Sequence, residues 1–127
     1  MNLATRRFSA RILQALTQSK ILGIRAGSHA HRFIGIWPVV VQGRLFVRSW
    51  DEKPDGWYRV LRQERYGHIQ IADRKLRVRA VQTRSEQIRN AVDRAYAEKY
   101  KSPGSLKYVR GFKRPRRRAT TTELVPA

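Results

Sequence analysis

The chain has 127 residues, with 28 lysines and arginines against 9 acidic residues and no cysteine, which gives a formal net charge of +19 at pH 7. Without cysteine it holds no disulfide, thiol nucleophile or cysteine-bound zinc, and its longest nearly apolar stretch, residues 33–41, is too short to cross a bilayer. An apolar fraction of 41% suffices for one folded domain, and the charge predicts an anionic partner that carries phosphate.

Residues 1–20 are predicted to form an N-terminal amphipathic helix. Its apolar side chains share one side of a helical wheel, at Phe8, Ile12, Leu13 and Leu16. An arginine-rich, acid-free helix of this kind either packs on the domain, which is the commoner case, or directs a protein to an organelle. Arg11 and Lys20 interrupt the apolar segment that a secretory signal needs, so we expect a cytoplasmic protein.

Residues 21–127 are predicted to form a second unit, built mainly of strands. The first three strands are expected over residues 21–25, 30–41 and 44–50, with turn signals at residues 26–28 and at Gly43. Pro38 lies inside the second strand, which indicates a sheet edge or a bulge because proline cannot donate to a ladder. A loop over residues 51–56 and a short helix over residues 57–64 follow.

Two further strands are predicted at residues 68–72 and 75–81. The second alternates apolar with basic residues, which is typical of a half-buried antiparallel strand with a basic outer face at Lys75, Arg77 and Arg79. A long helix is expected at about residues 84–100, begun by a capping box of Thr83 and Glu86. Its residues Arg89 and Asp93 are spaced as an i,i+4 ion pair.

The C-terminal segment combines a basic run over residues 113–118 with a last strand over residues 119–125. In all, six short strands are expected, and most neighbours lack a crossover helix between them. The sequence therefore predicts an antiparallel sheet closed into a small barrel with flanking helices, an α+β fold that is mainly β.

Five segments between residues 34 and 126 carry a resemblance to known proteins. They are residues 35–40 (GIWPVV), 45–49 (LFVRS), 54–59 (PDGWYR), 92–100 (VDRAYAEKY) and 118–126 (RATTTELVP). In order and spacing they resemble a bacterial family of unknown function within the FMN-binding split-barrel superfamily, related to pyridoxamine phosphate oxidases and deazaflavin-dependent nitroreductases. The resemblance implies a six-stranded split barrel that forms a homodimer and binds FMN or a deazaflavin nucleotide at the subunit interface.

The same resemblance implies a cofactor site and an oxidoreductase acting on a small molecule. Its phosphate candidates are Arg48, Ser49, Lys53 and Arg59, and its ring-lining candidates are Trp37, Trp50 and Trp57. An arginine fork, a hydroxyl group and a helix N-terminus suit a dianionic phosphate, and residues 48–59 supply all three. The plain alternatives are a solvated basic surface for the arginines and the lysine, and a core or dimer-interface role for Trp37.

The basic run in the tail favours a second hypothesis, in which the barrel has lost its cofactor and binds nucleic acid. The residues concerned are Lys113, Arg114, Arg116, Arg117 and Arg118, with Tyr108 and Phe112 just before them. Such cations bind nucleic-acid backbones through counterion release, and aromatic rings can stack on bases. The simpler alternative is a solvated tail.

The remaining candidates for chemistry are weak. His29 and His31 would share one face of a strand, but they have no cysteine or nearby acid beside them, so we expect surface histidines and no metal. The sequence shows neither a nucleophile with its base nor a glycine-rich phosphate loop, and so it gives no support to hydrolysis or phosphoryl transfer.

Overall fold

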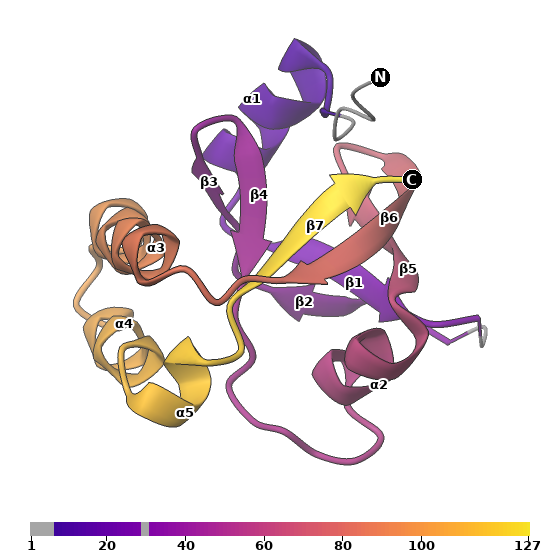
Figure 1. The fold of residues 1–127 in the computed structure, drawn as a ribbon. Coiled ribbons are helices and arrows are strands. Elements are labelled where there is room, and N and C mark those ends of the chain that lie inside the picture. The colour runs from indigo at the N-terminus through magenta and orange to yellow at the C-terminus, as the bar shows by residue number, and fades with distance from the viewer. Residues whose placement is uncertain (1–6, 29–30) are drawn as a thin grey trace.

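A seven-stranded antiparallel sheet organises residues 7–28 and 31–127, which are those that this computed structural model describes (Figure 1). The strands are β1 (Leu22–Ala26), β2 (Ile34–Ile36), β3 (Val39–Val41), β4 (Arg44–Val47), β5 (Tyr66–Ile71), β6 (Arg74–Gln82) and β7 (Thr122–Pro126). Their order across the sheet is β2-β1-β5-β6-β7-β4-β3. The helices are α1 (Ala10–Gln18), α2 (Trp57–Glu64), α3 (Glu86–Lys99), α4 (Leu106–Phe112) and α5 (Pro115–Arg118). The expected α+β fold is confirmed.

The predicted number of six strands is wrong, because the strand expected over residues 30–41 is broken at Trp37 and Pro38. β2 pairs with β1 and β3 pairs with β4, so the two halves lie at opposite edges of the sheet. Ile36 and Val39 are three Cα–Cα steps apart, at most about 11 Å. The two edges therefore approach each other here, and the sheet curls into a half-barrel (Figure 1).

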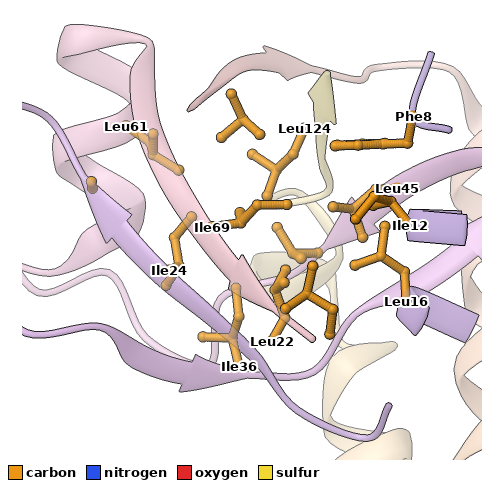
Figure 2. Close-up of a cluster of buried hydrophobic side chains, with 14 residues drawn as sticks. Phe8, Ile12, Leu16, Leu22, Ile24, Ile36, Leu45, Leu61, Ile69 and Leu124 are labelled. Carbon is orange, nitrogen blue, oxygen red and sulfur yellow. The ribbon is translucent and has the colours of Figure 1, made fainter. Parts of the chain in front are cut away.

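The main hydrophobic core fills the inside of this curl. Leu22 and Ile24 on β1, Leu45 on β4, Ile69 on β5 and Leu124 on β7 are fully buried there (Figure 2). The helix α1 closes the core with Ile12 and Leu16, Phe8 just before the helix also packs there, and α2 adds Leu61. The amphipathic helix thus packs on the sheet over its described part, while residues 1–6 of the expected 1–20 segment lie outside the described residues.

A second cluster lies on the outer face of the sheet, where α3 and α4 cover β3 and β4. It contains Val39, Phe46, Val92, Tyr96, Tyr100, Val109 and Phe112. The sequence predicted no helix after residue 100, but most of residues 106–118 is helical, in α4 and α5. None of the helices in residues 7–28 and 31–127 has the length and apolar character needed to cross a membrane.

The start of α3 differs in detail from the prediction. Ser85, not Thr83, is the N-cap, and its hydroxyl accepts the Ile88 N–H at 3.2 Å. The predicted ion pair between Arg89 and Asp93 does not form, because Asp93 binds Arg48 and Arg118 while Arg89 lies 3.7 Å from Glu86. The strand expected over residues 44–50 is β4, and it ends at Val47, three residues earlier than expected, because the Arg48 side chain points toward α3 and donates to Asp93.

Candidate functional site

A pocket of about 510 Å³ gathers six of the seven cofactor candidates named from the sequence. Trp37, Arg48, Ser49, Trp50, Lys53 and Trp57 all line it, and Arg59 does not. This aromatic pocket is completed by Ile34, Gly35, Ile36, Asp51, Gly56, Tyr108 and Phe112. The local order of the chain explains most of this convergence, since residues 48–56 form one continuous loop that runs from β4 to Trp57, the first residue of α2.

Trp37 forms part of the pocket wall and is held firmly. Its ring stacks on Tyr100 with centroids 4.1 Å apart and planes 3° from parallel, and its carbonyl accepts the Tyr96 hydroxyl at 2.8 Å. Tyr108 and Phe112 present their edges to it at 5.8 and 6.2 Å. Trp37 is therefore both a packing residue and a surface that a ligand ring can touch.

Trp50 stands at the mouth of the pocket, 39% exposed. The Arg117 guanidinium lies 3.6 Å from its ring centroid and donates to its carbonyl at 2.8 Å. Gly111 on α4 is the floor beneath the ring, because a Cβ there would lie 2.4 Å from the Trp50 side chain. The stacked guanidinium and the bare glycine together fix the indole in place.

A second pocket of about 620 Å³ adjoins the first and shares Ser49, Trp50 and Asp51 with it. Its other lining residues are Glu52, Arg59, Arg114, Arg116, Arg117 and Thr120, and we term it the arginine pocket. Four guanidinium groups outnumber two carboxylates, so the pocket favours an anion. The sequence predicts Arg59 near a phosphate but places Arg114, Arg116 and Arg117 on a separate nucleic-acid surface.

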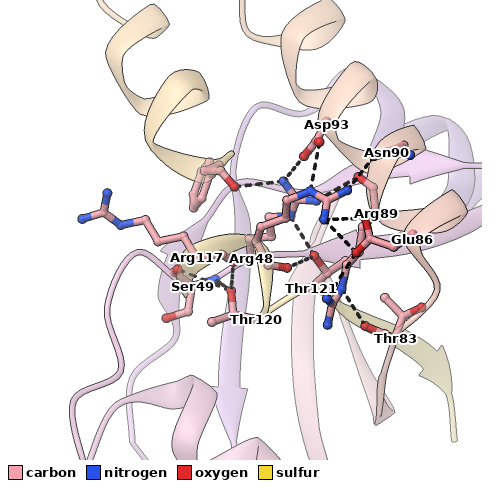
Figure 3. A network of polar contacts seen from close by, with 12 residues as sticks. Arg48, Ser49, Thr83, Glu86, Arg89, Asn90, Asp93, Arg117, Thr120 and Thr121 are labelled. Carbon is pink, nitrogen blue, oxygen red and sulfur yellow. Dashed lines mark hydrogen bonds and ion pairs between the residues drawn. The ribbon is translucent and has the colours of Figure 1, made fainter. Parts of the chain in front are cut away.

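Arg48 lines the aromatic pocket, but its guanidinium is held in a buried polar network (Figure 3). Its guanidinium donates to the Asp93 carboxylate at 2.6 Å, to the Thr121 hydroxyl at 2.8 Å, and to the backbone carbonyls of Phe112 and Arg89, each at 3.0 Å. Burial lowers the pKa of Arg48, although Asp93 opposes the shift. The side chain joins the end of β4 to α3, to α4 and to Thr121 just before β7. A phosphate could reach the guanidinium only by displacing one of these acceptors.

The remaining candidates have simpler surroundings. Ser49 is 4% exposed. Its N–H donates to the Thr120 hydroxyl at 2.8 Å, and its own hydroxyl donates to the Asp51 carbonyl. These contacts fix the conformation of the loop at its start. Lys53 is exposed on that loop, and Trp57 is half-buried against the main core. His31 contacts the carbonyls of Ala26 and Arg32, whereas His29 lies outside the described residues.

The tail cations divide into two groups. Lys113, Arg114 and Arg116 are exposed, but Arg118 turns inward and binds Glu86 at 3.0 Å, Asp93 at 3.1 Å and Asn90 at 2.6 Å. The basic run is therefore partly a structural clamp between α5 and α3. Within residues 7–28 and 31–127, no three histidine, cysteine or acidic side chains come together as metal ligands would.

Comparison with known proteins adds a family. A bacterial family described as "Uncharacterized protein conserved in bacteria (DUF2255)" matches residues 11–124. The chain belongs to this family. Among solved structures, this DUF2255 member is similar to the conserved hypothetical protein Rv2991 from Mycobacterium tuberculosis, with a TM-score of 0.60 and 11% identity over 100% of this chain and 84% of that one. At such identity the likeness supports the fold alone. No protein with a curated description matches the chain.

Proposed function

We propose that this protein binds a flavin or deazaflavin nucleotide, with the ring in the aromatic pocket and the phosphate in the arginine pocket. The observation that carries the proposal is that the two pockets share a wall at Ser49, Trp50 and Asp51. One ligand with a flat apolar ring at one end and a phosphate at the other would contact both. Each pocket also falls within the usual size range of small-molecule sites, about 300–1,000 Å³.

The aromatic pocket suits a fused ring for a physical reason. Trp37, Trp50 and Trp57 line it together with Tyr108 and Phe112, and aromatic side chains stack on a flat ring or meet its edge. Lys53 at the rim adds a cation beside the ring's carbonyl groups. Three exposed apolar side chains at this pocket, Ile34, Trp50 and Tyr108, are 41%, 39% and 38% accessible, which supports a ligand or partner that covers them.

The phosphate contact is best assigned to Arg59, Arg114 and Arg116. These arginines are exposed side chains of the arginine pocket, where their forks can donate two hydrogen bonds to one phosphate. Arg48 instead positions the pocket by holding α3 and α4 against β4, and Ser49 positions the loop. In this proposal the curled sheet is a split barrel of the FMN-binding type, and a second copy of the chain completes the site.

A bound flavin ring would supply hydride or electron transfer, and the protein would act as an oxidoreductase on a small molecule. The chain's own part is to hold the phosphate, stack on the ring and keep one face of the ring open. The expected FMN or deazaflavin thus fits the side chains that are present.

The test compares FMN with riboflavin, which lacks the phosphate, by quenching of flavin fluorescence. We expect the protein to bind FMN more tightly than riboflavin, and Arg59→Ala to shrink that difference about tenfold, because a hydrogen bond to a charged group contributes roughly 1.5–3 kcal/mol. Arg11→Ala, on the exposed side of α1, is the matched control and should leave both affinities unchanged. Equal affinities for FMN and riboflavin in the unaltered protein would disprove the assigned phosphate site.

One observation favours a second function, nucleic-acid binding through the tail. Lys113, Arg114 and Arg116 form an exposed group without a carboxylate partner in the described residues. If the tail binds nucleic acid, Lys113→Ala should weaken binding of a single-stranded oligonucleotide and reduce its salt dependence. Tight FMN binding together with an unaffected oligonucleotide affinity would rule this function out.

A further inference from the structure

The outer face of β1, β5 and β6 is a basic surface distinct from both pockets. Its side chains alternate with core residues along each strand, so they all point away from the main core. This basic sheet face consists of Arg25, Tyr66, His68, Lys75, Arg77 and Arg79. Phe33, from the segment before β2, packs over Gly23 on the same face, and none of these side chains is a carboxylate. The helices that contact these strands, α1 and α2, send their buried residues into the core on the other side.

Three of these residues form a row across the sheet. His68 lies opposite Arg25 on one neighbouring strand and opposite Arg77 on the other. Neighbouring strands are about 4.8 Å apart, and like charges placed directly opposite destabilise a sheet. Neither arginine has a carboxylate partner in residues 7–28 and 31–127. The row therefore favours an anion that the chain itself does not provide.

His68 gives independent evidence of an unmet contact. Its Nδ1 atom is buried and has no hydrogen-bond partner among the described residues. Burial, with the nearby Arg25 and Arg77, lowers the pKa of His68 and so favours the neutral ring. Buried polar atoms in folded proteins almost always have a partner, and a phosphate oxygen near this row would attract a proton onto the imidazole.

Aromatic rings lie between the cations. The Arg25 guanidinium is 4.6 Å from the Phe33 ring centroid, and the Lys75 ammonium is 5.8 Å from it. Arg77 is 4.6 Å from the ring of Tyr66, which is 41% exposed. Bases of single-stranded nucleic acids stack on aromatic rings and on guanidinium planes, while their phosphates bind the surrounding cations. A membrane surface would instead call for apolar side chains that insert between lipids.

We propose that the basic sheet face binds single-stranded nucleic acid, with phosphates along the Arg25–His68–Arg77 row and along β6, and bases against Tyr66 and Phe33. The cations of β6 recur at every second residue, about 6.7 Å apart, which suits the extended backbone of a single strand laid along β6. This site is independent of the nucleotide pocket and of the tail.

The test measures fluorescence anisotropy of a labelled oligouridylate titrated with the full chain over a range of KCl concentrations. Arg77→Ala should weaken binding about tenfold and reduce the magnitude of the slope of log affinity against log salt by about 0.7, the value for one phosphate contact to a single strand. Tyr66→Val should weaken binding about tenfold with the slope unchanged, because stacking carries no charge. Arg11→Ala removes the same charge from α1 and should change neither.

The outcomes separate this proposal from the others. Equal losses in Arg77→Ala and Arg11→Ala would mean general attraction to a cationic protein, and a loss confined to Lys113→Ala would move the site to the tail; either result overturns the proposal. Tighter binding to anionic phosphatidylserine vesicles than to the oligonucleotide would overturn it as well. All four substituted positions are exposed, and circular dichroism checks that each variant is folded. FMN affinity should be unaffected by Arg77→Ala, so a failure here leaves the proposed function standing.

Discussion

The guanidinium group of Arg48 shows how one buried residue can hold the wall of a pocket through contacts with distant segments. Its acceptors come from three segments far apart in sequence: Arg89 and Asp93 on α3, Phe112 at the end of α4, and Thr121 beside β7. Seen only in sequence, an arginine at the end of a strand resembles an exposed phosphate ligand. Its burial is set by α4 and α3, whose approach the local pattern around residue 48 does not encode.

We expect Arg48→Met to destabilise the protein strongly. The change leaves the Asp93 carboxylate and two carbonyl groups short of a donor in a largely buried place, and breaking a buried pair in this way costs about 3–5 kcal/mol. Arg118 still binds Asp93, so the lower end of the range applies. Urea denaturation measures the loss. Arg59→Met is the matched control: this exposed arginine should change stability by less than about 0.5 kcal/mol. Similar losses in both variants would contradict the assigned role of Arg48.

Gly111 is the second residue on which the pocket depends. In Gly111→Ala the new methyl group would lie 2.4 Å from the Trp50 ring, and the ring must leave its place beside Phe112. We expect a red shift of tryptophan emission and weaker flavin binding, even though alanine favours a helix over glycine by about 1 kcal/mol. Gly104→Ala is the control, since nothing lies within 4 Å of a Cβ at that position. An unchanged emission spectrum in Gly111→Ala would refute the packing described for Trp50.

At the scale of elements, the spacing of apolar residues predicted correctly those helices and strands whose type depends only on their own residues. Residues 57–64 form the expected short helix, and β6 has the expected basic outer face. In each case the spacing of the apolar residues on one side is enough to distinguish a helix from a strand. The cap of α3 was misplaced by two residues, since Thr83 and Ser85 offer the same hydroxyl chemistry. Likewise α4 was missed, because its short apolar face of Val109 and Phe112 contacts the second cluster, which exists only once the sheet has formed. The helix α5 was missed because its one proline and three arginines give no apolar face that periodicity could show.

The C-terminal end of α3 ties three elements together through Lys99. Its ammonium group donates to the carbonyls of Leu16 on α1 and Pro38 between β2 and β3, at 2.8 and 2.9 Å. Tyr100 donates to the same Pro38 carbonyl at 2.9 Å. Pro38 belongs to neither strand, and its carbonyl accepts hydrogen bonds from these two side chains instead of from a neighbouring strand. The end of α3 therefore fixes the segment between β2 and β3 in position. Burial, together with the neighbouring Lys20, lowers the pKa of Lys99 to about 8.

This pKa predicts a specific pH dependence of stability. Below pH 8 Lys99 is charged in both states and its burial destabilises the fold; between pH 8 and its ordinary pKa of 10.5 the folded state loses the proton while the unfolded state keeps it. Stability therefore rises with pH in that window. For this group alone the rise between pH 8 and 9.5 is about 1 kcal/mol, once solvent screening of the half-exposed ammonium is allowed for. Denaturation of the unaltered protein and of Lys99→Met at each pH isolates the effect, because all other titrations cancel. A difference that does not vary with pH would show that Lys99 titrates normally.

At the scale of the whole molecule, the +19 charge divides among separate places. Arg59, Arg114, Arg116 and Arg117 surround one pocket, Arg48 and Arg118 hold buried or inward contacts, and a further group lies on the sheet face. The sequence predicted that the cofactor candidates of residues 48–57 would gather, since they are neighbours in the chain. It could not predict that the tail arginines would join Arg59 at the same wall, because that contact depends on α5 folding back toward the loop.

The last prediction concerns assembly. Ile34 on the edge strand β2 is 41% exposed at the aromatic pocket, beside Trp50 and Tyr108. We expect a second copy of the chain to cover this apolar group, so the protein should sediment as a dimer at micromolar concentration. Ile34→Glu should shift it to monomers by placing a carboxylate in the contact, while its melting temperature changes by only a few degrees because the side chain is exposed. Tyr66→Glu is the matched control, since Tyr66 is equally exposed at 41% but lies on the basic sheet face, and this variant should remain a dimer. A monomer in the unaltered protein, or equal dissociation in both variants, would show that the pocket mouth is not a dimer interface.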